Sequence, residues 1–147
     1  MILNILFDTS VLIAAFVESH PKHKAALKFL TRAKEKEFEL FVSAHTILEV
    51  YSVLTSAPFK PKITTLTAKR LIENNIKTIA KKIVYLSDKE YFKIIEKMSD
   101  YDFKGGIVYD AIIVECALNS KVDEILTLNS KDFLRLTGND TLKINTV

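Results

Sequence analysis

The fold is decided near the N-terminus, by the segment Ile2-Leu3-Asn4-Ile5-Leu6-Phe7-Asp8-Thr9-Ser10. Residues 2–7 are apolar apart from Asn4, and such a run is too short to form a stable helix. A strand that is apolar on both of its faces is typical of a parallel sheet with helices on each side. The segment therefore predicts a buried parallel strand that ends at Asp8.

The rest of the chain alternates between strand-like and helix-like segments. Short apolar runs predict further strands at residues 38–42, within 78–86, at 124–128 and, at an edge of the sheet, at 142–145. Helical periodicity and capping residues predict helices at residues 11–17, 21–37, 43–55, 67–75, 87–101, 108–118 and 130–136. We therefore expect residues 1–147 to form a single α/β domain, with a three-layer α/β/α architecture and a central parallel sheet of four or five strands.

Capping residues indicate where several of these helices begin. Thr9 or Ser10 is expected to cap helix 11–17, and Ser43 to cap helix 43–55. Ser87 and Glu90 have the spacing of a capping box. The segment 58–61, which has a proline at each end, is expected to be an irregular loop.

The composition is that of an ordinary globular protein. With 48% hydrophobic and 27% charged residues, the 147-residue chain is too apolar to be disordered and long enough to bury a substantial core. The net charge of +3 is compatible with a nucleic-acid partner, but it is too small to indicate one by itself. The function must therefore be inferred from individual sites.

The sequence predicts a cytoplasmic protein that does not enter a membrane. Its longest apolar run, residues 11–17, is far shorter than the ~20 residues that cross a bilayer. The N-terminus lacks the basic region of a signal peptide, and Asp8 stands where such a peptide is apolar. Cys116 is the lone cysteine, which excludes a disulfide within the chain and suits a reducing compartment.

Four acidic residues are expected at one edge of the sheet. Asp8 directly follows the first strand, and Asp132 lies in the turn that leaves the strand at 124–128. Glu49 lies on the polar stripe of an otherwise apolar helix after the second strand, and Asp110 heads an apolar helix. In open parallel sheets, ligands bind beyond the carboxyl ends of the strands. For any one Asp alone, stabilising a helix N-terminus is the simpler explanation.

Together, these acids favour a metal site. Carboxylates gathered at one edge repel one another and raise each other's pKa unless a cation neutralises them. Oxygen ligands suit Mg²⁺ or Mn²⁺, and the sequence has no Cys/His cluster that would suit zinc. The three histidines, His20, His23 and His45, are expected at solvent-exposed or boundary positions without a catalytic role.

Four segments resemble the motifs of the PIN-domain family and follow one another in the family's order. They are residues 6–13, residues 43–50, Tyr109-Asp110-Ala111 and residues 126–133. The resemblance covers nearly the whole chain and implies metal-dependent cleavage of single-stranded RNA, whether mRNA, tRNA or rRNA. In size and plain architecture the chain is similar to the VapC-like toxins, which implies a homodimer and a small cognate antitoxin as partner.

The resemblance also implies roles for individual residues. Asp8 and Asp110 would bind the metal, Glu49 would bind it or orient a water, and Ser10 would support these ligands. With Asp132, these acids are the expected catalytic residues.

The chain departs from the family's pattern at Asn129, where many relatives carry an acid. An amide can coordinate weakly or hold a water, and Asp132 is the alternative source of a fourth charge. If neither fills this place, the site has three carboxylates. The alternative function is then a weak or inactive PIN-like module that binds RNA or protein.

Two other classes of protein fit the sequence less well. A phosphatase resembling the haloacid dehalogenases would use Asp8 as its nucleophile, but it needs a second Asp where Ser10 stands. A phosphoacceptor receiver domain needs an acid after the third strand. Asp88 lies there, but the capping box explains it, and the acidic pair expected after the first strand is missing.

Overall fold

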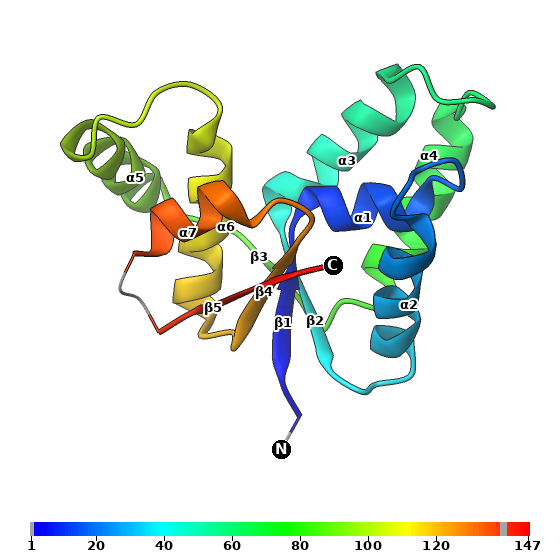
Figure 1. Cartoon of the computed structure of the whole chain (residues 1–147), viewed down its shortest axis with the longest axis horizontal. Helices are drawn as coiled ribbons and strands as arrows, with labels where there is room; N and C mark the ends of the chain where they lie inside the picture. The colour runs from blue at the N-terminus through cyan, green and yellow to red at the C-terminus, as the bar shows by residue number, and fades with distance from the viewer. Residues whose placement is uncertain (1, 139–140) are drawn as a thin grey trace.

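The computed structural model describes residues 2–138 and 141–147, which form a parallel sheet between two groups of helices (Figure 1). Within these residues the strands are β1 (Asn4–Phe7), β2 (Glu39–Ser43), β3 (Lys82–Val84), β4 (Glu124–Thr127) and β5 (Lys143–Thr146). Their order is β3-β2-β1-β4-β5, and every neighbouring pair is parallel. The expected α/β/α architecture with a central parallel sheet is confirmed.

The helices cover the two faces of the sheet in separate groups. They are α1 (Thr9–Phe16), α2 (His23–Lys34), α3 (Ala44–Ser56), α4 (Thr65–Ile72), α5 (Asp88–Asp100), α6 (Ile107–Ser120) and α7 (Ser130–Thr137), with a π-helical segment, η1 (Glu73–Lys77), continuing α4. In Figure 1, α5, α6 and α7 lie to the left of the sheet, and α1 to α4 lie above it and to its right. None of the helices that the structure describes is both long and apolar enough to cross a membrane.

Strand β1 separates two hydrophobic cores. Ile5 and Phe7 pack into the core beneath α1 to α4, whereas Leu6 faces the core beneath α5 to α7. Because successive side chains of a strand point to opposite faces, both faces of β1 are buried. This explains why its sequence is continuously apolar rather than alternating.

The structure corrects the expected start of the first helix and of the first strand. Asp8, rather than Thr9 or Ser10, is the N-cap of α1, because its carboxylate accepts a hydrogen bond from the Val11 N–H. Strand β1 begins at Asn4 rather than at residue 2, because Ile2 and Leu3 are exposed and the paired register with β2 starts at Asn4, opposite Glu39. The capping box at Ser87 and Glu90 is confirmed.

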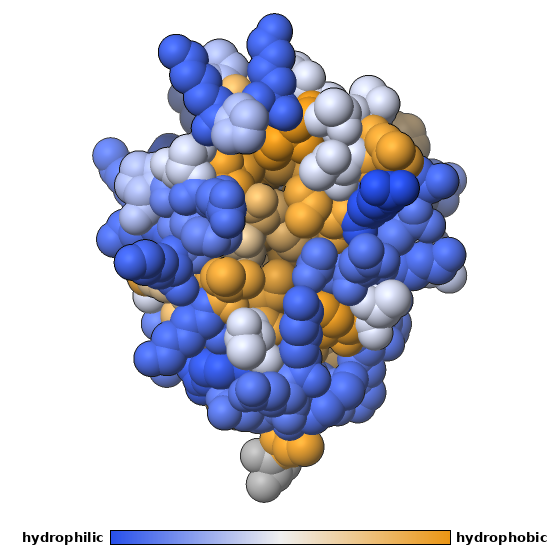
Figure 2. All heavy atoms as spheres, turned by 90° about the vertical axis from the view of Figure 1, so that its right-hand side faces the viewer, coloured by the Kyte–Doolittle hydropathy of each residue, from blue (hydrophilic) through white to orange (hydrophobic). Residues whose placement is uncertain are grey.

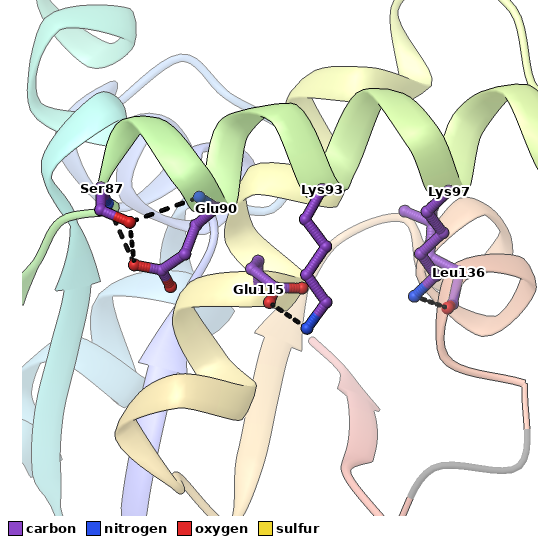
Figure 3. A network of polar contacts seen from close by, with 6 residues as sticks. All are labelled: Ser87, Glu90, Lys93, Lys97, Glu115 and Leu136. Atoms are coloured by element: carbon purple, nitrogen blue, oxygen red, sulfur yellow. Dashed lines mark hydrogen bonds and ion pairs between the residues drawn. The ribbon is translucent and has the colours of Figure 1, made fainter.

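Helix α5 is fixed to both other helices of its layer (Figure 3). The Lys93 Nζ lies 3.5 Å from the Oε1 of Glu115, a buried carboxylate of α6. One turn later, the Lys97 Nζ donates a 3.2 Å hydrogen bond to the Leu136 carbonyl near the end of α7. These contacts join the two helices that carry Asp110 and Asp132 into one packed layer.

Ser43 stands at the N-cap of α3 as expected, but its side chain makes no capping hydrogen bond, whereas Ser87 caps α5. This contrast allows a test of helix capping in this fold. Ser87→Ala removes the hydroxyl that accepts from the Glu90 N–H, and we expect unfolding in urea to show a loss of about 1 kcal/mol. Ser43→Ala is the matched control, because the buried Ser43 Oγ has no hydrogen-bond partner among the described residues. We expect the free energy of unfolding of that variant to change by only a few tenths of a kcal/mol. Equal losses in the two variants would contradict the capping role of Ser87.

Candidate active site

A small pocket at the carboxyl ends of β1 and β4 contains most of the predicted site residues. Its volume is about 230 Å³. It is lined by Asp8, Thr9, Ser10, Ile13, Glu49, Asp110, Ile113, Asn129 and Phe133. Residues from the beginning, the middle and the end of the chain thus meet beyond the carboxyl ends of the strands, where open parallel sheets bind their ligands.

Asp8 is the most buried acid of this pocket. Its Oδ1 accepts hydrogen bonds from the Ser10 hydroxyl (2.7 Å) and the Val11 N–H (3.1 Å), and its Oδ2 accepts one from the Thr127 hydroxyl (2.6 Å). Burial raises the pKa of Asp8 above its ordinary value, although the hydrogen bonds from Thr127, Ser10 and Val11 lower it in part. The carboxylate is therefore oriented by the protein and held in a site that disfavours its charge.

Thr127 is a site residue that the sequence reasoning missed. Its buried hydroxyl both donates to Asp8 and accepts from the Asn129 N–H at 3.0 Å. Ser10 makes a similar link, since its hydroxyl accepts from the Leu128 N–H at 3.1 Å. A hydroxyl residue between the apolar Leu126 and Leu128, at the end of the strand, was the available signal for Thr127.

Asp110 lies in the first turn of α6 and is half-buried. The pKa of Asp110 is raised to about 6, first by burial and then by the charges of three further carboxylates: Asp8, Asp132 and Glu49, in that order. The predicted mutual repulsion of the acids is therefore present at this position.

Glu49 reaches the pocket from the second turn of α3, and its carboxylate contacts a histidine. The Glu49 Oε2 lies 3.2 Å from the His45 Nε2, one helical turn earlier. The His45 ring in turn stacks on Tyr109 of α6, with ring centroids 5.4 Å apart and the planes tilted by 6°. His45 occupies the boundary position expected of it, but its contact with Glu49 and its stacking on Tyr109 were not predicted.

The structure distinguishes the two candidates for the fourth position of the site. Asn129 lines the pocket, as the residue that precedes α7. Asp132 does not line it, and its Oδ1 lies 3.4 Å from the Arg135 guanidinium. Asp132 therefore acts on the pocket through its charge, while the side chain that faces the pocket is an amide.

The donor chemistry of the pocket fits Mg²⁺ or Mn²⁺. Three carboxylates and one amide supply only oxygen donors, the type that these ions prefer. In the part of the chain that the structure describes, no three His, Cys, Asp or Glu side chains are already close enough to hold an ion. The three carboxylates therefore line one pocket without forming a preassembled ion site among the described residues.

Comparisons with known proteins identify the family. The family model of the PIN domain matches residues 5–139. Ribonuclease VapC40 of Mycobacterium tuberculosis is 29% identical over 106 residues, which cover 72% of each chain.

Solved structures show the same fold. The toxin VapC20 of M. tuberculosis, described as cleaving the sarcin-ricin loop, superposes with a TM-score of 0.70 at 13% identity, covering 89% of this chain and 94% of that one. VapBC2 of Rickettsia felis, bound to a DNA fragment from its promoter, superposes with a TM-score of 0.65 at 16% identity, covering 98% of each chain. At these identities, the likeness establishes the fold alone.

The repulsion at Asp110 has a consequence for the stability of the metal-free protein. A carboxyl whose pKa is raised on folding makes the native state less stable as the pH rises from about 4 through about 6. We expect Asp110→Asn to remove this dependence and to stabilise the metal-free protein at pH 8 by roughly 1–2 kcal/mol, a value reduced for partial solvent screening.

Urea unfolding in EDTA at pH 5 and pH 8 measures this effect. Asp102→Asn is the matched control, because that carboxylate is on the surface, outside the pocket. A variant Asp110→Asn that is less stable than the wild type at pH 8 would show that the acid supports the fold rather than opposing it.

Proposed function

The chain belongs to the PIN domain family, and from its carboxylate pocket we propose that it is a Mg²⁺- or Mn²⁺-dependent endoribonuclease that cleaves single-stranded RNA. We propose further that residues 1–147 act as one nuclease domain in the cytoplasm, as the toxin of a toxin–antitoxin pair. The observation that carries the proposal is the convergence of Asp8, Glu49 and Asp110 on one pocket, where burial and then the charges of neighbouring carboxylates, Asp8 first, raise the pKa of Asp110.

Each pocket residue has a part in this proposal. Asp8, Glu49 and Asp110 hold the ion through carboxylate oxygens, while Ser10 and Thr127 keep the Asp8 carboxylate oriented. When bound, the ion lowers the pKa of a coordinated water and neutralises charge on the phosphate. Hydrolysis would add a water across the phosphodiester, break the bond between phosphorus and the 3′-oxygen, and leave a 5′-phosphate and a 3′-hydroxyl.

The role of Asn129 decides between this enzyme and its alternative. An amide in place of an acid removes one negative charge from the pocket, which weakens the attraction for a divalent ion. This favours, as the second candidate, a PIN-like module that binds RNA or protein without cutting. Metal dependence of stability and of cleavage distinguishes the two.

We expect Mn²⁺ to raise the melting temperature of the wild type and to support cleavage of an unstructured RNA, and EDTA to abolish both effects. Asp110→Asn should lower kcat/KM at least about 100-fold, because it removes a carboxylate that would hold the ion. Asp132→Asn should have only a few-fold effect, since Asp132 does not line the pocket. Asp110→Asn is a cleaner probe than Asp8→Asn, because Asp8 also accepts the hydrogen bond from Thr127.

A wild type that binds no Mn²⁺ and cuts no RNA would favour the binding module instead. Loss of cleavage that is accompanied by loss of the folded state in Asp110→Asn would indicate a structural role for that acid. Thermal melting of the same samples separates these cases.

An apolar groove between α3 and α4 is the surface that we propose for the antitoxin. Its volume is about 490 Å³. It is lined by Ile47, Leu48, Tyr51, Thr65, Leu66, Lys69, Ile72 and Glu73. Figure 2 shows that the side of the molecule carrying α2 and α4 is hollowed, with apolar side chains inside a polar rim. The VapBC2 neighbour is a complex with a second protein, and an apolar helix is the partner segment that such a groove accepts.

The test uses the protein encoded by a short reading frame next to the gene, co-expressed with this chain. Leu48→Glu places a charge in the groove, and we expect it to abolish co-purification while RNA cleavage continues. Leu134→Glu is the matched control, because Leu134 is also exposed (56%, against 73% for Leu48) but lies on α7. Loss of the partner in both variants would show that the groove is not its site.

We also propose a homodimer, in which the exposed apolar side chains of α5 face the second copy. Phe92 and Ile95 are among these residues, and they lie three positions apart on one side of the helix. Burying such side chains between two copies is favourable. We expect Phe92→Glu to shift the mass measured by light scattering from dimer to monomer, and a wild type that is monomeric at all concentrations would contradict the proposal.

A further inference from the structure

Two aromatic rings stack beside the carboxylate pocket, and no part of the proposed chemistry uses them. His45 comes from α3 and Tyr109 from α6, helices that belong to opposite layers of the domain. Their rings are nearly parallel, tilted by 6° with centroids 5.4 Å apart. The stack therefore spans the two layers at the edge of the sheet where the acids meet.

Tyr109 is exposed at the start of a mostly buried helix. Residues 111–117 of α6 are all buried, whereas Tyr109 is 52% exposed although its ring stacks against His45. The ring is therefore held by a neighbouring ring and still offers aromatic surface to solvent. An exposed aromatic ring held in this way suits the stacking of a planar ligand.

The stack adjoins two of the acids that are proposed to hold the ion. Tyr109 directly precedes Asp110, and the His45 Nε2 lies 3.2 Å from the Glu49 Oε2. A phosphate bound at the pocket would place its neighbouring bases at the rim of the same pocket. Unpaired bases commonly stack on Tyr and His side chains, whereas bases within a duplex are already stacked on one another.

We propose that Tyr109 is the stacking platform for an unpaired nucleobase next to the scissile phosphate, and that His45 positions its ring. This inference rests on the proposed ribonuclease function and deepens it. It gives a physical reason for a preference for single-stranded RNA, because a paired base has no free face to offer. His45 acts through Tyr109, since its own side chain lies between that ring and Glu49.

The test combines a missing base with a missing ring. Cleavage is first mapped in an unstructured RNA, and each base that flanks the cut is then replaced in turn by an abasic nucleotide. For the wild type, we expect one abasic position to lower kcat/KM by about 5- to 100-fold, mainly by raising KM. Tyr109→Ala should cause a loss of similar size on the intact RNA and little further loss on that abasic RNA.

Several variants separate stacking from a structural effect. Tyr109→Phe should retain the sensitivity to the abasic nucleotide, whereas Tyr109→Leu, which keeps bulk without an aromatic face, should lose it. His45→Phe should retain it as well, because the phenyl ring preserves the stack. Tyr85→Ala removes a more exposed tyrosine, between β3 and α5, and should leave the kinetics unchanged.

The outcomes distinguish this inference from the function on which it rests. Suppose that the wild type cuts RNA and that the loss of kcat/KM from Tyr109→Ala multiplies with the loss from the abasic nucleotide. The two changes then act independently, so Tyr109 is not the stacking platform, while the ribonuclease function stands. An unchanged kcat/KM in Tyr109→Ala would overturn the platform in the same way. A wild type that cuts no RNA would overturn both, and thermal melting of each variant identifies any loss that comes from unfolding.

Discussion

The burial of one carboxylate at the junction of β1 and α1 is the constraint on which the site depends. Asp8 is buried, and such a charge is tolerated only where hydrogen bonds replace the lost water. Ser10, Val11 and Thr127 provide these bonds. The same bonds begin α1 and tie it to the end of β4. They therefore determine together where the helix starts, how it joins the sheet and how the Asp8 carboxylate is oriented.

Much of the fold could be predicted because it follows from local patterns. Continuous apolar character identified β1 as a strand buried on both faces, and the spacing of Ser87 and Glu90 identified the start of α5. The convergence of Asp8, Glu49 and Asp110 followed from a topological rule, since parallel strands present their carboxyl ends at a common edge. These inferences needed only the order of the elements and not the position of any side chain.

The remaining features depend on side chains that meet across elements, and no local pattern encodes such contacts. Thr127 bonds to a residue 119 positions away, and the stacking of His45 on Tyr109 joins helices from opposite layers. Asn129 rather than Asp132 lines the pocket, which the sequence could not decide because both residues follow β4 closely. Asp8 was identified as a ligand candidate but not as the N-cap of α1, because an acid directly after a strand fits either role and the sequence does not show that Val11 donates to it.

The pocket draws its residues from both helical layers, and this has a consequence during synthesis. Asp8 and Glu49 come from the first part of the chain, whereas Asp110 and Asn129 follow on α6 and at the start of α7. A nascent polypeptide that has not yet released α6 from the ribosome lacks half of the acidic cavity, whatever has already folded. The pocket is therefore complete only after the residues up to the start of α7 have been translated and have folded against the earlier part of the chain.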